Sequence, residues 1–220
     1  MDDLIIFLLM IIIPIGAQMY IMYTYNKYKK VNNSNNFSGF EVARSILDAN
    51  GLENVHVVEV HGQLSDHYDP KRKVVRLSTE VFHGETIASS SIAAHEVGHA
   101  IQDKESYTFL KVRSFIFPFA KIVSYAAYIM LIAAIVMEAI NLIWLAIGLM
   151  IFSLSFQLVT LPVEFNASQR AKEELNKLNL ISNSEMIGVE GVLKSAALTY
   201  VASLAASILQ ILRIVLRFRD

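Results

Sequence analysis

Four long apolar stretches alternate with polar ones along the chain. Each has about the 20 residues that a helix needs to cross a bilayer, and they cover residues 4–23, 115–137, 140–161 and 195–216. Only a short polar break at Glu138 and Asn141 separates the second stretch from the third. These two stretches therefore predict a helical hairpin whose ends lie on the same side of a membrane.

The first apolar stretch predicts a retained membrane anchor. Pro14, Gly16 and Gln18 are its only interruptions, and the preceding Met1-Asp2-Asp3 is acidic. A cleaved secretory signal, the alternative, would begin with basic residues and have a shorter apolar core.

The fourth apolar stretch is more polar than the others, because it contains serines, a threonine and Gln210. Two interpretations stay open. The stretch either crosses the membrane as a fourth helix, or it lies along the interface or packs against the other helices.

The polar residues after the first stretch begin with a linker and a short helix. An Asn/Ser run at 32–36 is typical of a linker. Ser38, followed three residues later by Glu41, is a capping-box pattern that begins a helix, and Gly51 is suited to end it.

Two runs rich in β-branched residues follow and predict strands at 55–60 and 73–77. Gly62 and Asp69-Pro70 provide turn signals between them. A short sheet therefore precedes residues 89–102, which have helical composition and no proline.

Composition places the chain in a membrane. Its 220 residues are 54% hydrophobic, its formal net charge is −1 and its mean hydropathy is +0.44, which is too apolar for an ordinary soluble domain. There is no basic surplus for nucleic acid, so none is expected as a partner. The absence of cysteine excludes disulfides, cysteine-ligated zinc and a thiol nucleophile, which leaves His, Glu and Asp as metal ligands.

The predicted helix at 89–102 carries the pattern His95-Glu96-Val97-Gly98-His99. Positions four apart face the same side of a helix, so His95 and His99 can bind one zinc while Glu96 faces the water that zinc activates. Glu96 would then take the proton of that water and pass it to the leaving amine. Two histidines on a helix can also occur without such a role, but the small, apolar flanks favour the metal site.

A catalytic zinc usually has three protein ligands and one open position. The best candidate for the third ligand is Glu164, because it follows the return of the predicted hairpin to the side that carries the two histidines. An acid at the end of an apolar run can instead simply mark a helix boundary. Glu173 and Glu174 are rivals, although with the lysines beside them they resemble a solvent-exposed face.

His67 and Tyr68 lie just before the second predicted strand. If that strand pairs with an extended substrate, either side chain can donate a hydrogen bond to the developing oxyanion. The alternative is that both pack beside the turn that Asp69-Pro70 begins. Three other histidines have no partner at ligand spacing and are expected to face solvent or to be structural: His56, His61 and His83.

Five motifs follow one another along the chain: HYDP at 67–70, VVRLS at 74–78, AAHEVGHAIQ at 93–102, LPVEFNAS at 161–168 and AALTYVA at 196–202. Together they resemble the YugP-type membrane zinc metallopeptidases of bacteria, and the similarity covers nearly the whole chain. The resemblance implies a neutral zinc endopeptidase in the cell membrane, with a zincin-like catalytic portion and with Glu164 as the third zinc ligand.

A more distant similarity is to the HtpX and Ste24 membrane proteases, which also place a membrane hairpin between the two-histidine helix and the glutamate ligand. Those relatives carry an aspartate four residues after the glutamate, which orients a ligand histidine. Here that position is Ser168. Ser168 is therefore a candidate partner of a ligand histidine, and the relatives' substrate preference does not transfer.

We thus expect a mainly α integral membrane protein of about four transmembrane helices with a small α+β catalytic portion. Its predicted segments are an N-terminal anchor at 1–25, an α+β part with the two-histidine helix at 26–113, a membrane hairpin at 114–162, a helical segment with the third ligand at 163–194 and a C-terminal membrane helix at 195–220.

Basic residues predict which side of the membrane the site faces. They flank the predicted spans on the catalytic side, at Lys27, Lys29, Lys30, Lys111, Arg113, Arg170, Lys172, Lys177 and Lys194. The positive-inside rule therefore predicts a multi-pass plasma-membrane protein whose active site faces the cytoplasm. Three arginines disagree if the fourth stretch crosses, because they would then lie outside: Arg213, Arg217 and Arg219.

The predicted function is that of a membrane zinc metalloendopeptidase. Its cofactor would be Zn²⁺, its substrates peptides or proteins, membrane proteins among them, and its surroundings the lipid bilayer. The alternatives are a zinc-binding membrane scaffold or regulator without turnover, and a zinc amidohydrolase that acts on lipid-linked amides. The intact Glu96 favours an enzyme, because a non-catalytic metal site needs no general base.

Overall fold

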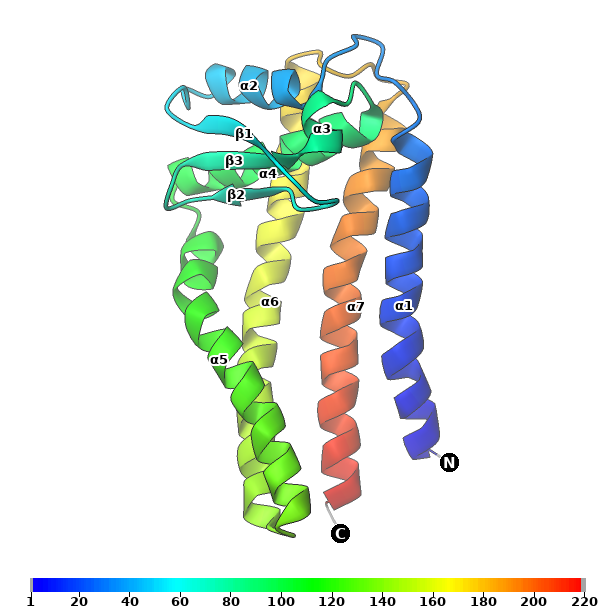
Figure 1. The fold of residues 1–220 in the computed structure, drawn as a ribbon, viewed down its shortest axis with the longest axis vertical. Helices are drawn as coiled ribbons and strands as arrows, with labels where there is room; N and C mark the ends of the chain where they lie inside the picture. The colour runs from blue at the N-terminus through cyan, green and yellow to red at the C-terminus, as the bar shows by residue number, and fades with distance from the viewer. Residues whose placement is uncertain (1, 219–220) are drawn as a thin grey trace. The chain divides into compact units, whose positions relative to one another are not determined.

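The computed structural model describes residues 2–218, and Arg219 therefore lies outside the described residues. The chain is mainly helical with a small sheet, which confirms the predicted fold class (Figure 1). Its elements are α1 Asp2–Tyr28, α2 Gly39–Ala49, β1 His56–Val60, β2 His67–Asp69, β3 Val74–Ser78, α3 Thr79–His83, α4 Ile87–Lys104, α5 Thr108–Val136, α6 Ile140–Lys177 and α7 Met186–Phe218.

The chain forms two compact units. The hairpin unit comprises residues 1–18, 108–162 and 198–220, and the sheet unit comprises residues 19–107 and 163–197. Three helices, α1, α6 and α7, contribute residues to both units. The sheet unit therefore contains the two-histidine helix α4 and also the part of α6 that carries Glu164.

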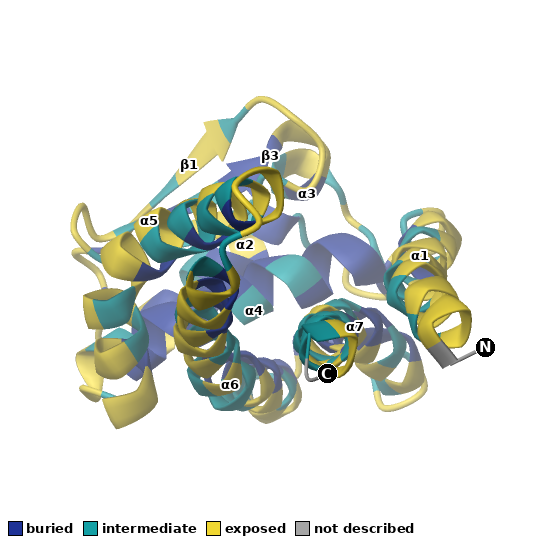
Figure 2. Cartoon of the chain, turned by 90° about the horizontal axis from the view of Figure 1, so that it is seen from below, coloured by how far each residue is buried: buried dark blue, intermediate teal, exposed yellow. Residues whose placement is uncertain are grey.

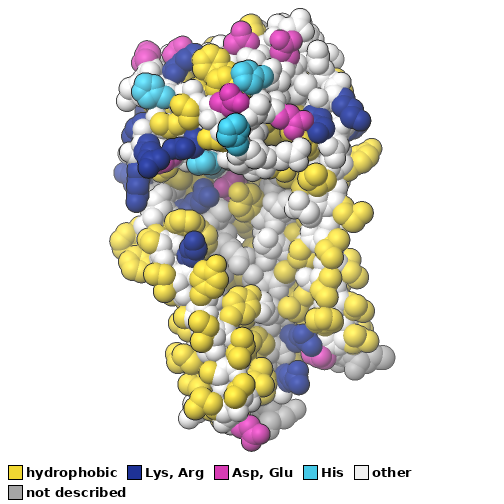
Figure 3. All heavy atoms as spheres, in the orientation of Figure 1, with side chains coloured by type: hydrophobic (Ala, Val, Ile, Leu, Met, Phe, Trp, Pro, Cys, Tyr) yellow, Lys and Arg dark blue, Asp and Glu magenta, His cyan; other side chains and the backbone are white. Residues whose placement is uncertain are grey.

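The hairpin unit is built from apolar helices. In the described chain, α1, α5, α6 and α7 are each long and apolar enough to cross a membrane. Large apolar side chains face outward on α5, where Phe115 is 74% and Val136 77% exposed (Figure 3). Contiguous apolar surface of this kind marks contact with lipid rather than water.

The residues of α7 within the hairpin unit pair their polar groups with neighbouring helices. Gln157 Nε2 on α6 donates to Ser207 Oγ at 2.8 Å, and Tyr128 OH on α5 donates to Gln210 Oε1 at 3.4 Å. Such bonds are how membrane helices accommodate polar side chains. The whole helix has 33 residues and is about 50 Å long at the usual rise per residue.

The sheet unit contains a three-stranded sheet of order β1-β3-β2, in which β3 pairs parallel with β1 and antiparallel with β2. The two predicted strands correspond to β1 and β3 within one residue at each end. The turn at Asp69 is also confirmed, because its Oδ1 accepts from the backbone N–H groups of Lys71 and Arg72. The packing alternative is confirmed for Tyr68, which packs against the core. Strand β2 was not predicted, because three residues are too few to show a period.

The core of the sheet unit lies between the sheet and the helices. Val75 and Leu77 of β3 are fully buried against apolar residues of α2 and α4, such as Leu47 and Val97. Figure 2 shows α4 largely in the colour of buried residues. The predicted limits of α2 are confirmed, because Ser38 and Glu41 form a capping box and Gly51 follows the helix with φ +62°.

Helix α6 continues where the sequence analysis placed a segment boundary. Pro162 lies inside it, and the helix extends to Lys177, so the segment predicted at 163–194 begins within a helix, and the division between the two units falls at the same place, after Pro162. A proline removes one backbone hydrogen bond and bends a helix, but neighbouring helices can hold the helix together across it. Because the helix does not stop there, Glu164 lies on a rigid element rather than in a loop.

Helices α4 and α6 approach each other closely at Gly98. A Cβ atom added there would lie 2.6 Å from the backbone oxygen of Ala167 on α6, well inside van der Waals contact. Because backbone cannot move aside as a side chain can, only glycine lets the two helices meet at this distance.

We predict that Gly98→Ala separates α4 from α6. Overpacking of this kind costs about 1–3 kcal/mol, so thermal unfolding of the detergent-purified protein should occur at a clearly lower temperature. Gly148→Ala is the matched control, because nothing lies within 4 Å of its added Cβ and alanine is the better helix former. Equal melting temperatures for the two variants would contradict the packing argument.

Candidate metal centre

His95 and His99 are held side by side by α4. They lie four residues apart on a continuous helix that begins after Thr86, whose side chain accepts from the N–H of Ser89. The centroids of the two imidazole rings are 4.8 Å apart. Both rings are largely buried, so the helix holds two nitrogen donors in one protected place.

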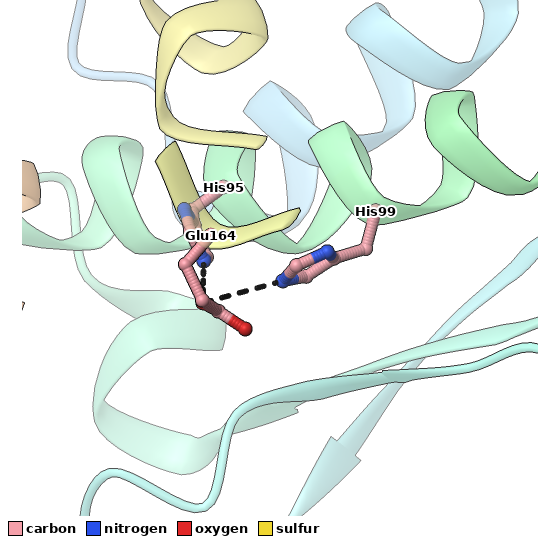
Figure 4. A group of neighbouring side chains, drawn as sticks. All are labelled: His95, His99 and Glu164. Carbon is pink, nitrogen blue, oxygen red and sulfur yellow. Dashed lines mark hydrogen bonds and ion pairs between the residues drawn. The ribbon is translucent and has the colours of Figure 1, made fainter. Parts of the chain in front are cut away.

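Glu164 brings the third donor from α6. Its Oε2 atom lies 3.3 Å from His95 Nε2 and 3.7 Å from His99 Nε2, and the residue is only 3% exposed (Figure 4). Among the described residues, His95, His99 and Glu164 are the histidines and acids whose potential ligand atoms all lie within 4.8 Å of one another.

These distances suit a zinc ion. Ligand atoms about 2.1 Å from a tetrahedral zinc lie roughly 3.4 Å from one another, close to the two carboxylate–imidazole separations. Two imidazole nitrogens and one carboxylate oxygen are also a donor set that zinc uses in catalytic sites, where a fourth position stays open. The three residues therefore fit the ion that the sequence suggested.

The rival acids point to other partners. Glu173 is exposed and accepts from Gln169 Nε2 at 2.7 Å. Glu174 accepts from Asn50 Nδ2 at 2.9 Å and from Lys177 Nζ at 3.0 Å. Neither belongs to the group of donors around the two histidines.

Each imidazole also contacts a polar side chain through its other nitrogen. His95 Nδ1 lies 3.2 Å from Ser168 Oγ, at the position the sequence comparison singled out. His99 Nδ1 lies 3.0 Å from Oε1 of Gln102, which sequence reasoning missed. The available signal was an amide three residues after His99, on the same side of the helix.

Glu96 lies next to His95 on α4 and is buried. The pKa of its carboxyl is raised to about 7, chiefly by burial and also by the nearby Glu164 and Asp66 carboxylates. His95 and a backbone hydrogen bond from Tyr68 act in the opposite direction. Glu96 is not one of the three grouped donors. It is therefore a second buried carboxyl beside the site, chemically distinct from Glu164.

The residues proposed for the oxyanion lie on β2. Tyr68 donates its hydroxyl to Asp103 Oδ2 at 2.7 Å, so this donor already has an acceptor. His67 is exposed, and its Nδ1 lies 2.8 Å from the backbone oxygen of Ser65. The other three histidines are exposed, as expected: His56, His61 and His83.

Comparison with known proteins agrees with this chemistry. The family model described as "Putative neutral zinc metallopeptidase" matches residues 3–219. The "Putative membrane protease YugP" of Bacillus subtilis (strain 168) is 47% identical over 202 residues, which cover 92% of this chain and 90% of that protein. No solved structure matches significantly. The family match extends over almost the entire chain, and the chain belongs to the putative neutral zinc metallopeptidase family.

Proposed function

We propose that the chain is a membrane-embedded zinc endopeptidase in which His95, His99 and Glu164 hold the ion. The observation that carries this proposal is the convergence of their three donors, from two helices, within 4.8 Å. A zinc ion bound there would polarise a substrate carbonyl and make a water molecule more acidic.

The residues around the donors have separate tasks in this mechanism. Glu96 accepts a proton from the attacking water and returns it to the leaving amine, which is general acid–base catalysis. Its place beside His95, but outside the donor group, leaves its carboxylate available for this.

Strand β2 offers a place for the substrate backbone. The strand expected to pair with a substrate corresponds to β3, which is the central strand and is paired on both sides, so that expectation is wrong. Strand β2 lies at the edge of the sheet and pairs with β3. An extended peptide can add to such an edge through main-chain hydrogen bonds. The backbone hydrogen bond from Tyr68 to Glu96 links this strand to the proposed base, so a peptide bound here would lie near it.

We also propose a plasma-membrane location with the metal centre facing the cytoplasm, and peptides or proteins, including membrane proteins, as substrates. Membrane association is supported by the four apolar helices and by the membrane protease relative. The basic residues at the ends of the spans in the sheet unit support the orientation, whereas Arg213 and Arg217 near the end of α7 disagree with it.

Replacing the third ligand should weaken metal binding. The detergent-purified wild type is expected to hold about one zinc per chain. Glu164→Ala should lose at least about tenfold in zinc affinity, because it removes one of three protein ligands. Elemental analysis and titration against a chromophoric chelator measure both quantities. Glu173→Ala is the control, and an equal affinity in the two variants would exclude Glu164 as a ligand.

Glu96→Gln should separate metal binding from turnover. The amide cannot take a proton, so casein cleavage should fall by about 10²–10⁴-fold while zinc stays bound. Glu53→Gln, at an exposed position of the sheet unit, is the matched control. Wild-type activity in Glu96→Gln would remove this residue from the mechanism.

The same assay distinguishes the alternative functions. Mass spectrometry of the products identifies cleaved peptide bonds, whereas release of an acyl group from lipid-linked amides without peptide cleavage would favour an amidohydrolase. Zinc bound by a wild-type protein that hydrolyses neither class of substrate would favour a regulator.

The proposed orientation can be tested with single cysteines, because the native chain has none. Met137→Cys lies in the turn between α5 and α6, and Glu53→Cys lies in the sheet unit, both at exposed positions. A membrane-impermeant maleimide should label Met137→Cys in intact cells and Glu53→Cys only after permeabilisation. The reverse pattern would place the metal centre outside the cytoplasm.

A further inference from the structure

Gln102 is a fully buried amide beside the metal centre. It lies on α4, three residues after His99, with 0% of its surface exposed. An amide in such a place is costly unless its polar atoms find partners. Its Oε1 lies 3.0 Å from His99 Nδ1, and its Nε2 donates to the backbone oxygen of Val163 at 2.8 Å and to Asn166 Oδ1 at 2.9 Å.

The partners of Gln102 fix which end of the amide faces His99. The backbone oxygen of Val163 can only accept, so the NH₂ group must point to it. The Asn166 oxygen is fixed in turn by Arg170, whose guanidinium only donates and lies 2.8 Å away. Arg170 is itself held by Glu105 at 2.6 Å. The amide oxygen of Gln102 is therefore left to face the imidazole.

This orientation determines the tautomer of His99. An amide oxygen only accepts, so His99 Nδ1 must carry the proton and donate it to Gln102. His99 Nε2, on the other side of the ring, then presents a lone pair on the side of Glu164. A neutral imidazole with a free Nε2 lone pair is the form that binds a metal.

Gln102 also connects the two helices that supply the ligands. It belongs to α4, and both acceptors of its NH₂ group belong to α6, where Val163 immediately precedes Glu164 and Asn166 follows it by two positions. A shift of α6 relative to α4 would break these bonds. One side chain thus orients one donor and restrains the backbone around another.

Ser168 does not have the same effect on His95. Its hydroxyl lies 3.2 Å from His95 Nδ1, but a hydroxyl can donate or accept, so the contact alone does not select a tautomer. The two histidines are therefore supported unequally, and His99 is the one whose form is set by the structure.

We infer that Gln102 is a positioning residue that fixes His99 as the Nδ1-protonated tautomer and ties α4 to the segment of α6 carrying Glu164. This inference rests on the proposed zinc site. Outer partners of this kind typically account for 10–100-fold in metal affinity.

Three variants test this role, with zinc itself as the probe. Gln102→Met keeps the approximate volume and removes the acceptor, so zinc affinity should fall about 10–100-fold. Gln102→Glu keeps an acceptor for His99 Nδ1 but loses the NH₂ group, so it should bind zinc at least tenfold more tightly than Gln102→Met. Gln169→Met, at an exposed glutamine of α6, is the control and should bind like the wild type.

The comparison separates positioning from packing. A residue that only fills space would give wild-type affinity in Gln102→Met. A residue that only ties the helices together would give equal losses in Gln102→Met and Gln102→Glu, because both lack the donor. Either result would overturn the inference. A wild type that binds no zinc would instead refute the proposed metal site.

A second pair of variants covers the case in which Gln102→Met does not fold. Asn166→Asp keeps an oxygen acceptor for Gln102 and Arg170, whereas Asn166→Leu removes it. The inference requires weaker zinc binding in Asn166→Leu than in Asn166→Asp, measured by the same chelator titration. Equal affinities would contradict the orienting chain from Arg170 to His99.

Discussion

The approach of α4 to α6 is the interaction on which the candidate site depends. His95 and Glu164 are 69 positions apart in the chain, yet their side chains lie 3.3 Å apart. The two helices can come this close because Gly98 has no side chain and lies against the backbone of Ala167. Gln102 then bonds across the same interface. Without this contact, α4 would carry two histidines and no third donor.

The apolar helices could be predicted because hydropathy is a local property. The limits of these helices could not be predicted from hydropathy. Helix α5 begins at Thr108, seven residues before the apolar stretch, and includes Lys111 and Arg113. Likewise α6 continues through Pro162, where a local rule predicts a boundary. Tertiary packing extends helices beyond the residues that a bilayer requires. Strand β2 was not predicted, because its three residues are extended only through their pairing with β3 and carry no local pattern.

The candidate site was predictable to the extent that its residues share a short spacing. His95, Glu96 and His99 follow from the period of one helix. The prediction of Glu164 required a topological argument, because a membrane hairpin returns to the side on which it began. In the structure the Glu164 carboxylate lies close to both imidazoles. Gln102 ends the motif at 93–102, but its role appears only when Val163 and Asn166 are seen opposite it. Tyr68 is the opposite case. The sequence suggested it as an oxyanion donor, but in the structure its hydroxyl donates to Asp103.

The tautomer set by Gln102 has a consequence for the charge that the site must contain. With Nδ1 protonated, His99 turns a lone pair toward a carboxylate oxygen 3.7 Å away. Two lone pairs facing each other repel, whereas a metal ion between them would be attracted to both. The network from Arg170 to His99 therefore prepares the Nε2 lone pair of His99 for a metal ion rather than for a direct hydrogen bond to Glu164.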